Sequence, residues 1–265
     1  MLMDRVYGYI SDPIKAVGES AVTNFSLQLA PKLTQVVTGD PDLRPFCTTT
    51  NQYDLESCTG NATADSVEVL NAIQGLPPVQ LSRMFAWTLA RNMDGNLSKN
   101  EGTHIRNCFQ VLASFGICRE DLPSGQGGWP YDSTKATLLP DTMAMRAATG
   151  HRIHSYYRIV ETGQARVDKM LEALRAHHPV VFGTQVDDVF EQISDMTPWK
   201  RPTGTLKGGH AMMVVGYITG QGFIVKNSWG PDWGENGFCV MAEEIFTWDQ
   251  TEDIWVPTDG MGFKS

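Results

Sequence analysis

The pattern of hydrophobic and polar positions changes character about halfway along the chain. In the first half, apolar residues recur at roughly helical spacing, as they do after Ser57, a residue type that caps helix N-termini. In the second half, short runs of apolar and β-branched residues are separated by turn residues such as Gly220-Gln221-Gly222. This order predicts a helical first half and a mostly antiparallel sheet in the second half, which is a fold of the α+β class.

The same pattern places the individual elements. Gly116 marks the end of one helix, and a loop rich in glycine and proline follows over residues 122–130. Prolines interrupt the first 45 residues, so residues 1–40 are expected to form an arm or a short leader. Helices are predicted over residues 24–29, 57–74, 79–91, 101–115 and 165–176, and strands over residues 180–186, 211–217, 223–227 and 238–241.

Length and charge limit the possible function classes. A chain of 265 residues suits one large domain or two small lobes that share a cleft. The 21 basic and 30 acidic residues give a net charge of −9, which argues against nucleic acid as a partner. No apolar stretch is long enough to cross a membrane, and residues 1–10 lack the apolar centre of a signal peptide. We therefore expect a soluble, cytoplasmic or virion-associated protein without a membrane partner, and the oligomeric state stays open.

The cysteines do not indicate a disulfide framework or a metal site. Their number, five, is odd, and the sequence contains no Cys-x-x-Cys pair. Cys108 and Cys239 lie within a predicted helix and a predicted strand, where a buried structural role is expected, and pairing of Cys47 with Cys118 is left open. The two histidines of residues 151–154 lack neighbouring ligands in the sequence, so neither a metal nor another cofactor is expected.

Three separate sequence blocks supply a nucleophile, a base and an orienting group. Cys58 begins a predicted helix, whose positive N-terminal end favours a thiolate. His210 follows two glycines and precedes an apolar strand, so its ring is expected at the start of that strand. Asn227 ends the next strand, and two adjacent antiparallel strands would bring it beside His210, with Trp229 covering their hydrogen bond. This set of side chains fits nucleophilic catalysis by cysteine.

The residues around this triad carry a more specific signal. Gln52 precedes Cys58 by six residues, and Asn227-Ser228-Trp229-Gly230 is followed by Trp233-Gly-Glu-Asn-Gly237. These blocks resemble the active-site blocks of the papain-like cysteine peptidases, and the resemblance extends from about residue 41 to about residue 256. Further segments resemble a bacterial and bacteriophage branch of that family, namely Asp42–Cys47, Asn100–Arg106, Phe115–Cys118 and Trp129–Asp132.

The resemblance implies a papain-like two-lobe fold and a cysteine endopeptidase. A helical left lobe would span about residues 41–130 and an antiparallel, β-barrel-like right lobe about residues 131–265, with the active site in the cleft between them. The Cys58 thiolate, paired with the His210 imidazolium, would attack a protein or peptide substrate and form a thioester. His210 would act as base and acid, and Asn227 would orient its ring.

The resemblance also implies roles for the neighbours of the triad. The Gln52 side chain and the Cys58 backbone N–H would form the oxyanion hole. Ser228 and Trp229 would support the catalytic residues. The residues expected to contact the substrate are Glu56, Ser57, Gly209 and Ala211.

The cysteine block departs from the family pattern. Leu55-Glu-Ser-Cys-Thr59 stands where plant and lysosomal members have Cys-Gly-Ser-Cys-Trp, and Tyr53 replaces a glycine. If its side chain points into the cleft, the Glu56 carboxylate would border a substrate subsite and favour Lys or Arg. The alternative is that Glu56 turns to solvent and has no role in selectivity. Two alternatives stay open: a catalytically weak or inactive papain-fold binding or scaffold protein, and a cell-wall amidase or endopeptidase.

The first forty residues are shorter than the long helical leader that is typical of the resembling enzymes. A structural arm that packs on the β lobe is therefore expected rather than a removable inhibitor. Deletion of this arm would then lower stability and would not raise activity.

Overall fold

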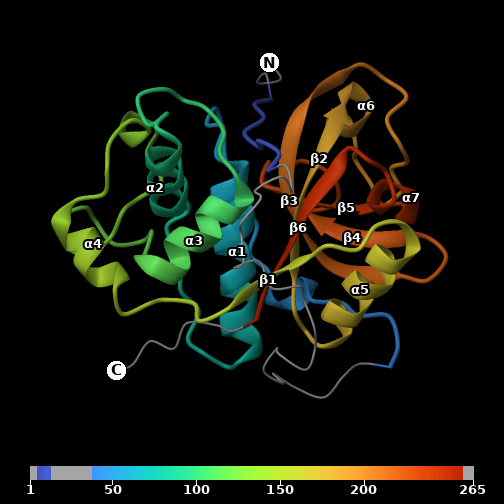
Figure 1. Cartoon of the computed structure of the whole chain (residues 1–265), viewed down its shortest axis with the longest axis horizontal. Coiled ribbons are helices and arrows are strands. Elements are labelled where there is room, and N and C mark those ends of the chain that lie inside the picture. The colour runs from blue at the N-terminus through green and yellow to red at the C-terminus, as the bar shows by residue number, and fades with distance from the viewer. Residues whose placement is uncertain (1–4, 13–37, 259–265) are drawn as a thin grey trace.

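The computed structural model describes residues 5–12 and 38–258, so the helix predicted over residues 24–29 lies outside the described residues. Within the described ranges, two lobes lie side by side (Figure 1). Helices α1 to α4 form one lobe, and a six-stranded sheet with helices α5 to α7 forms the other. This arrangement confirms the predicted α+β class and the two-lobe architecture.

The helical lobe contains the three helices expected in the first half and a shorter fourth one. α2 begins later than predicted, because the Ser82 side chain accepts a hydrogen bond from the Phe85 N–H over 3.0 Å and caps the helix there. The chain stays in this lobe beyond residue 130, since Ile117 donates a backbone hydrogen bond to His151 after α4. The helices are α1 (Cys58–Ile73), α2 (Arg83–Asp94), α3 (Ile105–Ser114) and α4 (Thr142–Ala148), with 3₁₀ helices at Arg44–Phe46 and Ser133–Lys135.

α1 lies at the centre of the molecule, between the other helices and the sheet (Figure 1). Gly60 permits the close approach of α2, because a Cβ atom there would lie 2.6 Å from the Arg83 carbonyl oxygen and 2.7 Å from Trp87 Cβ. The prediction that Ser57 caps α1 with its side chain is wrong. The Ser57 hydroxyl instead lies 2.6 Å from the Tyr131 hydroxyl, which competes for it.

The β lobe is built on antiparallel strands in the order β1-β6-β2-β3-β4-β5. β2 to β5 confirm the four predicted strands, and the turn at Gly220 joins β3 to β4 as expected. β1 and β6 pair with each other and extend one side of the sheet. The strands are β1 (Tyr156–Ile159), β2 (Val180–Asp187), β3 (Leu206–Ile218), β4 (Gly222–Lys226), β5 (Phe238–Met241) and β6 (Thr251–Pro257), and the helices are α5 (Gly163–Arg175), α6 (Asp188–Glu191) and α7 (Glu243–Phe246).

β3 is longer than the sequence pattern indicates. It begins at Leu206, so His210 lies within the strand, opposite Thr184 of β2, and not at the start of the strand as predicted. The two glycines before His210 are therefore part of the sheet and not of a turn. On its other edge β3 pairs with β4 from Met213 onward, so His210 has a strand partner in β2 only.

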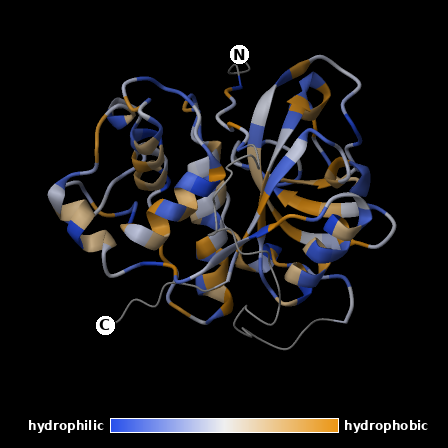
Figure 2. Ribbon diagram, in the orientation of Figure 1, coloured by the Kyte–Doolittle hydropathy of each residue, from blue (hydrophilic) through white to orange (hydrophobic). Residues whose placement is uncertain are grey.

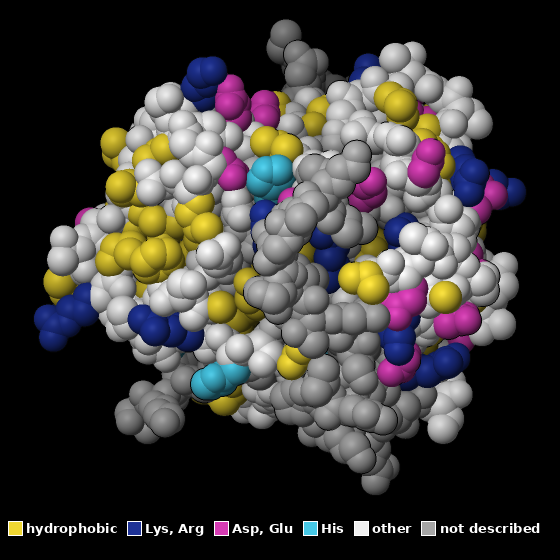
Figure 3. Space-filling model, in the orientation of Figure 1, with side chains coloured by type: hydrophobic (Ala, Val, Ile, Leu, Met, Phe, Trp, Pro, Cys, Tyr) yellow, Lys and Arg dark blue, Asp and Glu magenta, His cyan; other side chains and the backbone are white. Residues whose placement is uncertain are grey.

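Hydrophobic residues gather inside each lobe, and one group reaches the surface. Figure 2 shows hydrophobic segments on the strands of the β lobe and hydrophilic segments on the outer turns. α5 covers the sheet with buried side chains such as Met170 and Leu174. Hydrophobic side chains also gather on the outside of the helical lobe (Figure 3), and the exposed ones in this part of the chain include Leu138, Leu139 and Met143.

The five cysteines all carry free thiols, so the pairing of Cys47 with Cys118 that the sequence left open does not occur in this structure. Cys108 and Cys239 are fully buried, in agreement with the structural role expected for them. Across residues 5–12 and 38–258, no helix combines the length and the apolar character needed to span a bilayer.

Candidate active site

The first residue of α1 and the middle of β3 meet at the boundary between the two lobes. The backbone N–H of Ala211, the residue after His210, donates a hydrogen bond to Cys58 Sγ over 3.4 Å. Cys58 and His210 are both fully buried. The fold therefore brings together the two residues that the sequence predicts as nucleophile and base.

The His210 ring is held by Asn227. Nε2 lies 2.8 Å from Asn227 Oδ1, and the Ser228 backbone N–H donates to the same oxygen over 2.7 Å. Because this oxygen accepts hydrogen bonds, Nε2 carries the proton in this contact. The other ring nitrogen, Nδ1, is buried and has no hydrogen-bond partner among the described residues. Nδ1 is therefore the nitrogen that can exchange a proton with a thiol.

Aromatic rings surround His210 on the side of the β lobe. Trp229 stacks on the imidazole with ring centroids 4.7 Å apart and an interplanar angle of 26°. Phe190 of α6 lies 5.5 Å from Trp229, and 5.0 Å from both Trp233 and Trp199, between ring centroids. We call Phe190, Trp199, Trp229 and Trp233 the aromatic cage. All four are buried, so the cage separates the imidazole from solvent on this side.

Hydrogen bonds build the site on the side of the helical lobe. Gln52 Oε1 accepts a hydrogen bond from Ser228 Oγ over 2.6 Å, which orients the amide. Its Nε2 then donates to the Leu55 carbonyl oxygen over 3.0 Å. The Tyr131 hydroxyl donates to the Gln52 carbonyl oxygen over 2.9 Å. Ser228, which the resemblance placed beside the triad, therefore orients the expected oxyanion donor.

A buried ion pair lies behind these hydrogen bonds. Arg83 pairs with Glu120, and both side chains are only 6% exposed. Arg83 also donates to Asn61 Oδ1 over 3.0 Å, and its guanidinium carbon lies 4.3 Å from the centroid of the Tyr131 ring. We call Asn61, Arg83, Glu120 and Tyr131 the polar network. Only Tyr131 lies in a segment that the resemblance singled out, Trp129–Asp132, and no sequence pattern indicates that the four residues meet, because they come from separate elements.

Two of the residues expected to contact substrate have partners inside the protein. The Ser57 hydroxyl is buried and accepts a hydrogen bond from Asn61 Nδ2 over 3.0 Å, besides its contact with Tyr131. The Glu56 carboxylate is half-buried and accepts a backbone hydrogen bond from Gly102. Burial raises the pKa of Glu56 more than this hydrogen bond lowers it.

Residues 5–12 run between the two lobes (Figure 1), and we call them the N-terminal arm. The Tyr9 N–H donates to the Gly209 carbonyl oxygen of β3 over 3.1 Å. The Ile10 N–H donates to the Thr103 carbonyl oxygen over 3.1 Å on the side of the helical lobe. The described part of the arm therefore contacts both lobes, whereas the sequence led us to expect contact with the β lobe.

Gly8 of the arm lies directly against the cysteine block. Its N–H donates a hydrogen bond to the Cys58 sulfur, and its carbonyl oxygen accepts one from the Thr103 N–H over 3.0 Å. A Cβ atom at Gly8 would lie 1.8 Å from the Glu56 carbonyl oxygen, so no side chain fits at this position. Two residues earlier, the Val6 carbonyl oxygen accepts a hydrogen bond from Gln52 Nε2 over 3.2 Å.

Burial shifts the pKa values of Cys58 and His210 in opposite directions. Desolvation raises the pKa of Cys58 to about 11, although hydrogen bonds from Ala211 and Gly8 oppose this shift. Desolvation also lowers the pKa of His210 to about 4, against the effect of its hydrogen bond with Asn227. Both shifts favour the uncharged forms of the two groups while they are buried. The thiolate–imidazolium pair implied by the resemblance stays a prediction.

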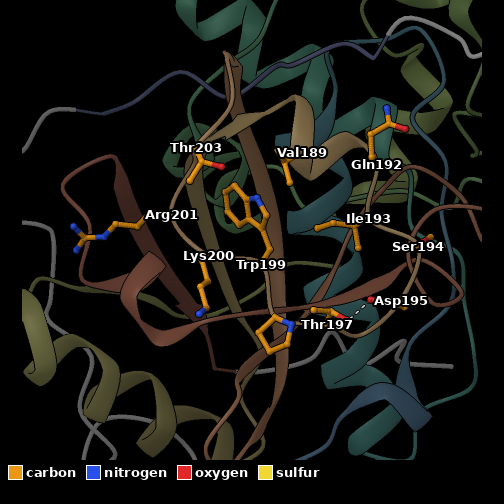
Figure 4. Close-up of a pocket in the computed structure, with 11 residues that line it drawn as sticks. Val189, Gln192, Ile193, Ser194, Asp195, Thr197, Trp199, Lys200, Arg201 and Thr203 are labelled. Carbon is orange, nitrogen blue, oxygen red and sulfur yellow. Dashed lines mark hydrogen bonds between the residues drawn. The ribbon is translucent and has the colours of Figure 1, made fainter.

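A separate pocket of 580 Å³ opens beside α6 (Figure 4). Val189 and Gln192 line it, and Trp199 of the aromatic cage forms part of its wall. Glu191, which lies between Val189 and Gln192 in the sequence, instead accepts a hydrogen bond from the Tyr7 hydroxyl of the arm. α6 therefore stands between this pocket and the cleft that holds Cys58.

Comparison with known proteins establishes the family. Residues 42–253 match the family model described as "Papain family cysteine protease". The chain belongs to the papain family of cysteine proteases. This papain-family protease has the cysteine endopeptidase activity and the fold that the sequence resemblance implied.

Similar proteins cover most of the chain. The uncharacterized peptidase C1-like protein L477 of Acanthamoeba polyphaga mimivirus is 28% identical in an alignment of 284 positions, gaps included. The alignment covers 96% of this chain and 87% of that protein. The crystal structure of xylellain, a cysteine protease from Xylella fastidiosa, superposes with a TM-score of 0.78 at 26% identity and covers 96% of both chains. Cathepsin B-like CP2 of Giardia intestinalis is 35% identical over 57% of this chain, but the match spans only 49% of that protein.

Proposed function

We propose that this papain-family protease hydrolyses peptide bonds with Cys58 as nucleophile, His210 as general base and acid, and Asn227 as the orienting residue. The observation that carries this assignment is the 2.8 Å contact between His210 Nε2 and Asn227 Oδ1. It leaves the buried Nδ1 as the ring nitrogen without a partner among the described residues. The next residue in β3, Ala211, contacts the Cys58 sulfur directly.

The reaction follows from this geometry. Transfer of the thiol proton from Cys58 to His210 Nδ1 produces a thiolate, which attacks the scissile carbonyl carbon. The oxygen that becomes negative accepts hydrogen bonds from Gln52 Nε2 and the Cys58 N–H. His210 returns the proton to the leaving amine, and the C–N bond breaks to leave a thioester. His210 then takes a proton from water, whose oxygen adds to the thioester carbon. The C–S bond breaks to release the acid product, and His210 returns the proton to the Cys58 sulfur.

The contact between Gln52 and the arm supports its place in the oxyanion hole. Gln52 Nε2 donates to the Val6 carbonyl oxygen, so this amide reaches a peptide carbonyl in the cleft. Its orientation is fixed from behind by the Ser228 hydroxyl. An oriented donor lowers the barrier more than a mobile one, because it does not have to reorganise as charge develops.

We also propose that residues 5–12 of the arm keep the cleft closed, and the structural role expected for the arm from the sequence stays a prediction. Gly8 presents an N–H group, and not a carbonyl carbon, to the Cys58 sulfur. The Gly8 carbonyl oxygen accepts a hydrogen bond from the Thr103 N–H. The carbonyl oxygen that accepts a hydrogen bond from Gln52 Nε2 is that of Val6. Cleavage would require one carbonyl group with its carbon at the Cys58 sulfur and its oxygen at Gln52 Nε2. None of the contacts named here for residues 5–12 provides such a carbonyl, so we infer that the arm blocks the site without being cleaved.

Thiol labelling tests the closure. Gly8→Ala should expel the arm because its Cβ would meet backbone at 1.8 Å, whereas Gly39→Ala is a matched control with nothing within 4 Å of the added atom. An epoxide that alkylates papain-like thiols should label Cys58 at least tenfold faster in Gly8→Ala than in Gly39→Ala, as mapped by mass spectrometry. Equal labelling of the two variants would contradict closure by the arm.

Hydrolysis of casein tests the nucleophile. In the Gly8→Ala chain, Cys58→Ala should abolish hydrolysis, because no thiol remains to form the thioester. Cys108→Ala and Cys239→Ala serve as controls and should retain activity when folded. Undiminished hydrolysis by the Cys58→Ala chain would contradict the assignment.

The substrate class, the cellular location and the branch of the family are inferred from the family match, the charge, the thiols and the similar proteins. We infer protein or peptide substrates and no nucleic-acid or membrane partner, which the family and the net charge of −9 support. Five free thiols support a reducing setting, cytoplasmic or virion-associated. Similarity to a bacterial protease supports the bacterial part of the expected branch, and the bacteriophage part stays a prediction. A preference of Glu56 for Lys or Arg stays a prediction.

A further inference from the structure

One peptide unit carries both the Ser57 carbonyl group and the Cys58 N–H, which is one of the two proposed oxyanion donors. The Ser57 carbonyl oxygen accepts two hydrogen bonds over 3.0 Å, one from the Asn61 backbone N–H and one from Asn61 Nδ2. The first is the ordinary bond of a helix turn, whereas the second comes from a side chain. Because a peptide unit is planar, a group that holds its carbonyl oxygen also fixes the direction of its N–H.

The orientation of the Asn61 amide follows from its contact with Arg83. Arg83 Nη1 donates a hydrogen bond to Asn61 Oδ1 over 3.0 Å. A guanidinium group has donors only, so the amide oxygen faces Arg83 and Nδ2 faces the Ser57 carbonyl group. Asn61 is fully buried, so solvent does not compete for these bonds. Asn61 therefore holds the peptide unit of the Cys58 N–H from a fixed position.

The other proposed oxyanion donor, Gln52, is reached by the same chain of hydrogen bonds. The Tyr131 hydroxyl donates to the Gln52 carbonyl oxygen over 2.9 Å, since a carbonyl group only accepts. Tyr131 has a single proton to donate, so the Ser57 hydroxyl, 2.6 Å away, donates to the Tyr131 oxygen. Ser57 Oγ in turn accepts from Asn61 Nδ2 over 3.0 Å. Every bond of this chain therefore runs in one direction, from Arg83 to Gln52.

None of these bonds uses the reacting atoms. The chain contains neither the Cys58 sulfur nor the His210 ring, and it reaches the oxyanion hole only through backbone carbonyl groups. A guanidinium group stays charged at every working pH, and aligned hydrogen bonds that begin at a charge strengthen one another in a protein interior. The chain therefore acts on the stability of the oxyanion and not on the formation of the thiolate.

We propose that Asn61 and Tyr131 are positioning residues of the oxyanion hole. Asn61 holds the peptide unit that carries the Cys58 N–H, and Tyr131 holds the backbone of Gln52. This inference rests on the proposed endopeptidase function and deepens it by connecting both oxyanion donors to one chain of hydrogen bonds. The oxyanion exists only in the transition state and the tetrahedral intermediate, so loss of either residue should lower kcat and leave KM unchanged.

A matched pair of variants at position 61 tests the hydrogen bond apart from the shape of the side chain. In the full Gly8→Ala chain, Asn61→Val should reduce kcat for a fluorogenic peptide about 10-fold, with KM changed by less than about 2-fold. Asn61→Thr has the same shape but carries a hydroxyl that can donate to the carbonyl group four residues earlier in the helix. It should bring kcat back to within about 3-fold of the parent. Equal kcat values for the Val and Thr variants would overturn the role of Asn61.

Alkylation of Cys58 separates positioning from damage to the nucleophile. Iodoacetamide reacts with the thiolate without forming an oxyanion, so Asn61→Val and Tyr131→Phe should be alkylated within about 2-fold of the parent's rate. Urea unfolding checks that both variants keep their fold. An alkylation rate that falls as far as kcat does would show that the nucleophile itself is disturbed, and would contradict the proposal.

Combination with Gln52→Ala shows which donor each residue serves. Tyr131→Phe should reduce kcat about 10-fold when Gln52 is present and less than about 2-fold in the Gln52→Ala chain, because it acts through that residue. Asn61→Val should still reduce kcat about 10-fold in the Gln52→Ala chain, since it acts through the Cys58 N–H. Tyr217→Phe removes a hydroxyl that donates to Glu243 and is the matched control, which should keep the parent's kcat. An equal effect of Tyr131→Phe with and without Gln52 would overturn the role of Tyr131.

A peptide aldehyde tests the oxyanion hole without turnover. With acetyl-phenylalanyl-glycinal, the Cys58 sulfur bonds to the aldehyde carbon and the thiol proton moves to the aldehyde oxygen, which then lies in the hole. Asn61→Val and Tyr131→Phe should each weaken this binding at least about 3-fold and leave binding of the corresponding alcohol unchanged.

The outcomes distinguish this proposal from the proposed function. Cleavage of peptides by the parent, with kcat and aldehyde affinity unchanged in the variants, overturns the positioning roles and keeps the peptidase. Aldehyde binding that weakens as expected, without cleavage of any peptide by the parent, keeps the positioning roles and overturns the peptidase. Neither aldehyde binding nor cleavage by the parent overturns both.

Discussion

The two sides of the active site hold their catalytic residues by different physical means. On the side of the β lobe, the aromatic cage packs around His210, and Trp229 stacks on its ring at 4.7 Å. On the side of the helical lobe, the polar network surrounds the cysteine block with a buried ion pair and hydrogen bonds. Packing of apolar rings tolerates small changes of volume, whereas a buried charge tolerates no loss of its partner. The cysteine side is therefore the more vulnerable of the two.

This difference explains how the altered cysteine block still forms a defined site. The block lacks the disulfide cysteine and the glycines of the resembling plant and lysosomal enzymes. The polar network supplies connections instead, since Arg83 bonds to the Asn51 carbonyl oxygen over 3.3 Å and to the Asn61 side chain. Tyr131 ties the Gln52 backbone to the Ser57 hydroxyl. Side chains from α2 and from a distant loop thus fix the segment around the nucleophile.

Breaking the ion pair should have the largest effect. Glu120→Ala leaves the buried Arg83 without its carboxylate, which should lower the free energy of unfolding by about 3–5 kcal/mol. Urea unfolding of the full chain measures the change. Replacing the pair together, as Arg83→Met with Glu120→Leu, should recover most of the loss because no charge remains buried. An equal loss in the single and the double variant would show that packing, and not charge pairing, holds this side.

Removal of the expected oxyanion donor should have the second-largest effect, on kcat and not on the free energy of unfolding. Gln52→Ala, made in the Gly8→Ala chain, removes one oxyanion donor and should reduce kcat by about 10²–10³-fold. Steady-state hydrolysis of a peptide substrate measures it, and urea unfolding checks that the variant keeps its fold. An unchanged kcat would mean that another donor takes the place of Gln52.

The pH dependence of Cys58 alkylation should show the effect of burial between the two lobes on the pKa of the thiol. A thiol whose pKa is about 11 is protonated at neutral pH, so its alkylation should accelerate with rising pH until about pH 11. At neutral pH its thiolate fraction is about a hundredfold below that of an ordinary cysteine. In Gly8→Ala, water re-enters the cleft and the profile should move to lower pH. Iodoacetamide kinetics with mass mapping of Cys58 test this, and coincident profiles would contradict it.

A change in the aromatic cage should have the smallest effect on stability. Phe190→Leu keeps an apolar side chain and leaves no charge unpaired, so the free energy of unfolding should fall by only about 1–3 kcal/mol. The measurement is the same urea unfolding that is used for Glu120→Ala. A loss as large as that of the broken ion pair would remove the contrast between the two sides.

The sequence alone predicts much of the framework and the triad. Four strands and four described helices follow from periodicity, because their apolar residues repeat in a local pattern. Cys58, His210 and Asn227 were singled out because each lies in a distinctive block at the start or the end of a predicted element. In the structure His210 contacts Asn227, and Ala211 beside it contacts Cys58, while the catalytic roles of the three residues stay a proposal.

The misses depend on contacts that no local pattern contains. β6 escaped prediction because charged residues interrupt its apolar run, and Asp253 points inward only through a backbone distortion. The Ser57 hydroxyl was assigned to a helix cap, but Tyr131 competes for it from a distant loop. The need for glycine at position 8 depends on the folded position of the Glu56 backbone. A Cβ atom on residue 8 would lie 1.8 Å from the Glu56 carbonyl oxygen. Such features require the three-dimensional neighbours to be known.

The covalent link between the arm and the lobes it joins has a consequence for how the site opens. Because residues 5–12 and 38–258 belong to one chain, the arm meets the cleft at an effective concentration set by the connecting stretch 13–37, and dilution of the protein does not release it. A single cut in that stretch would turn the arm into a separate short ligand, which dissociates once its free concentration falls below its dissociation constant. Before such a cut, dilution does not open the site. After it, dilution releases the arm, and the site then stays open.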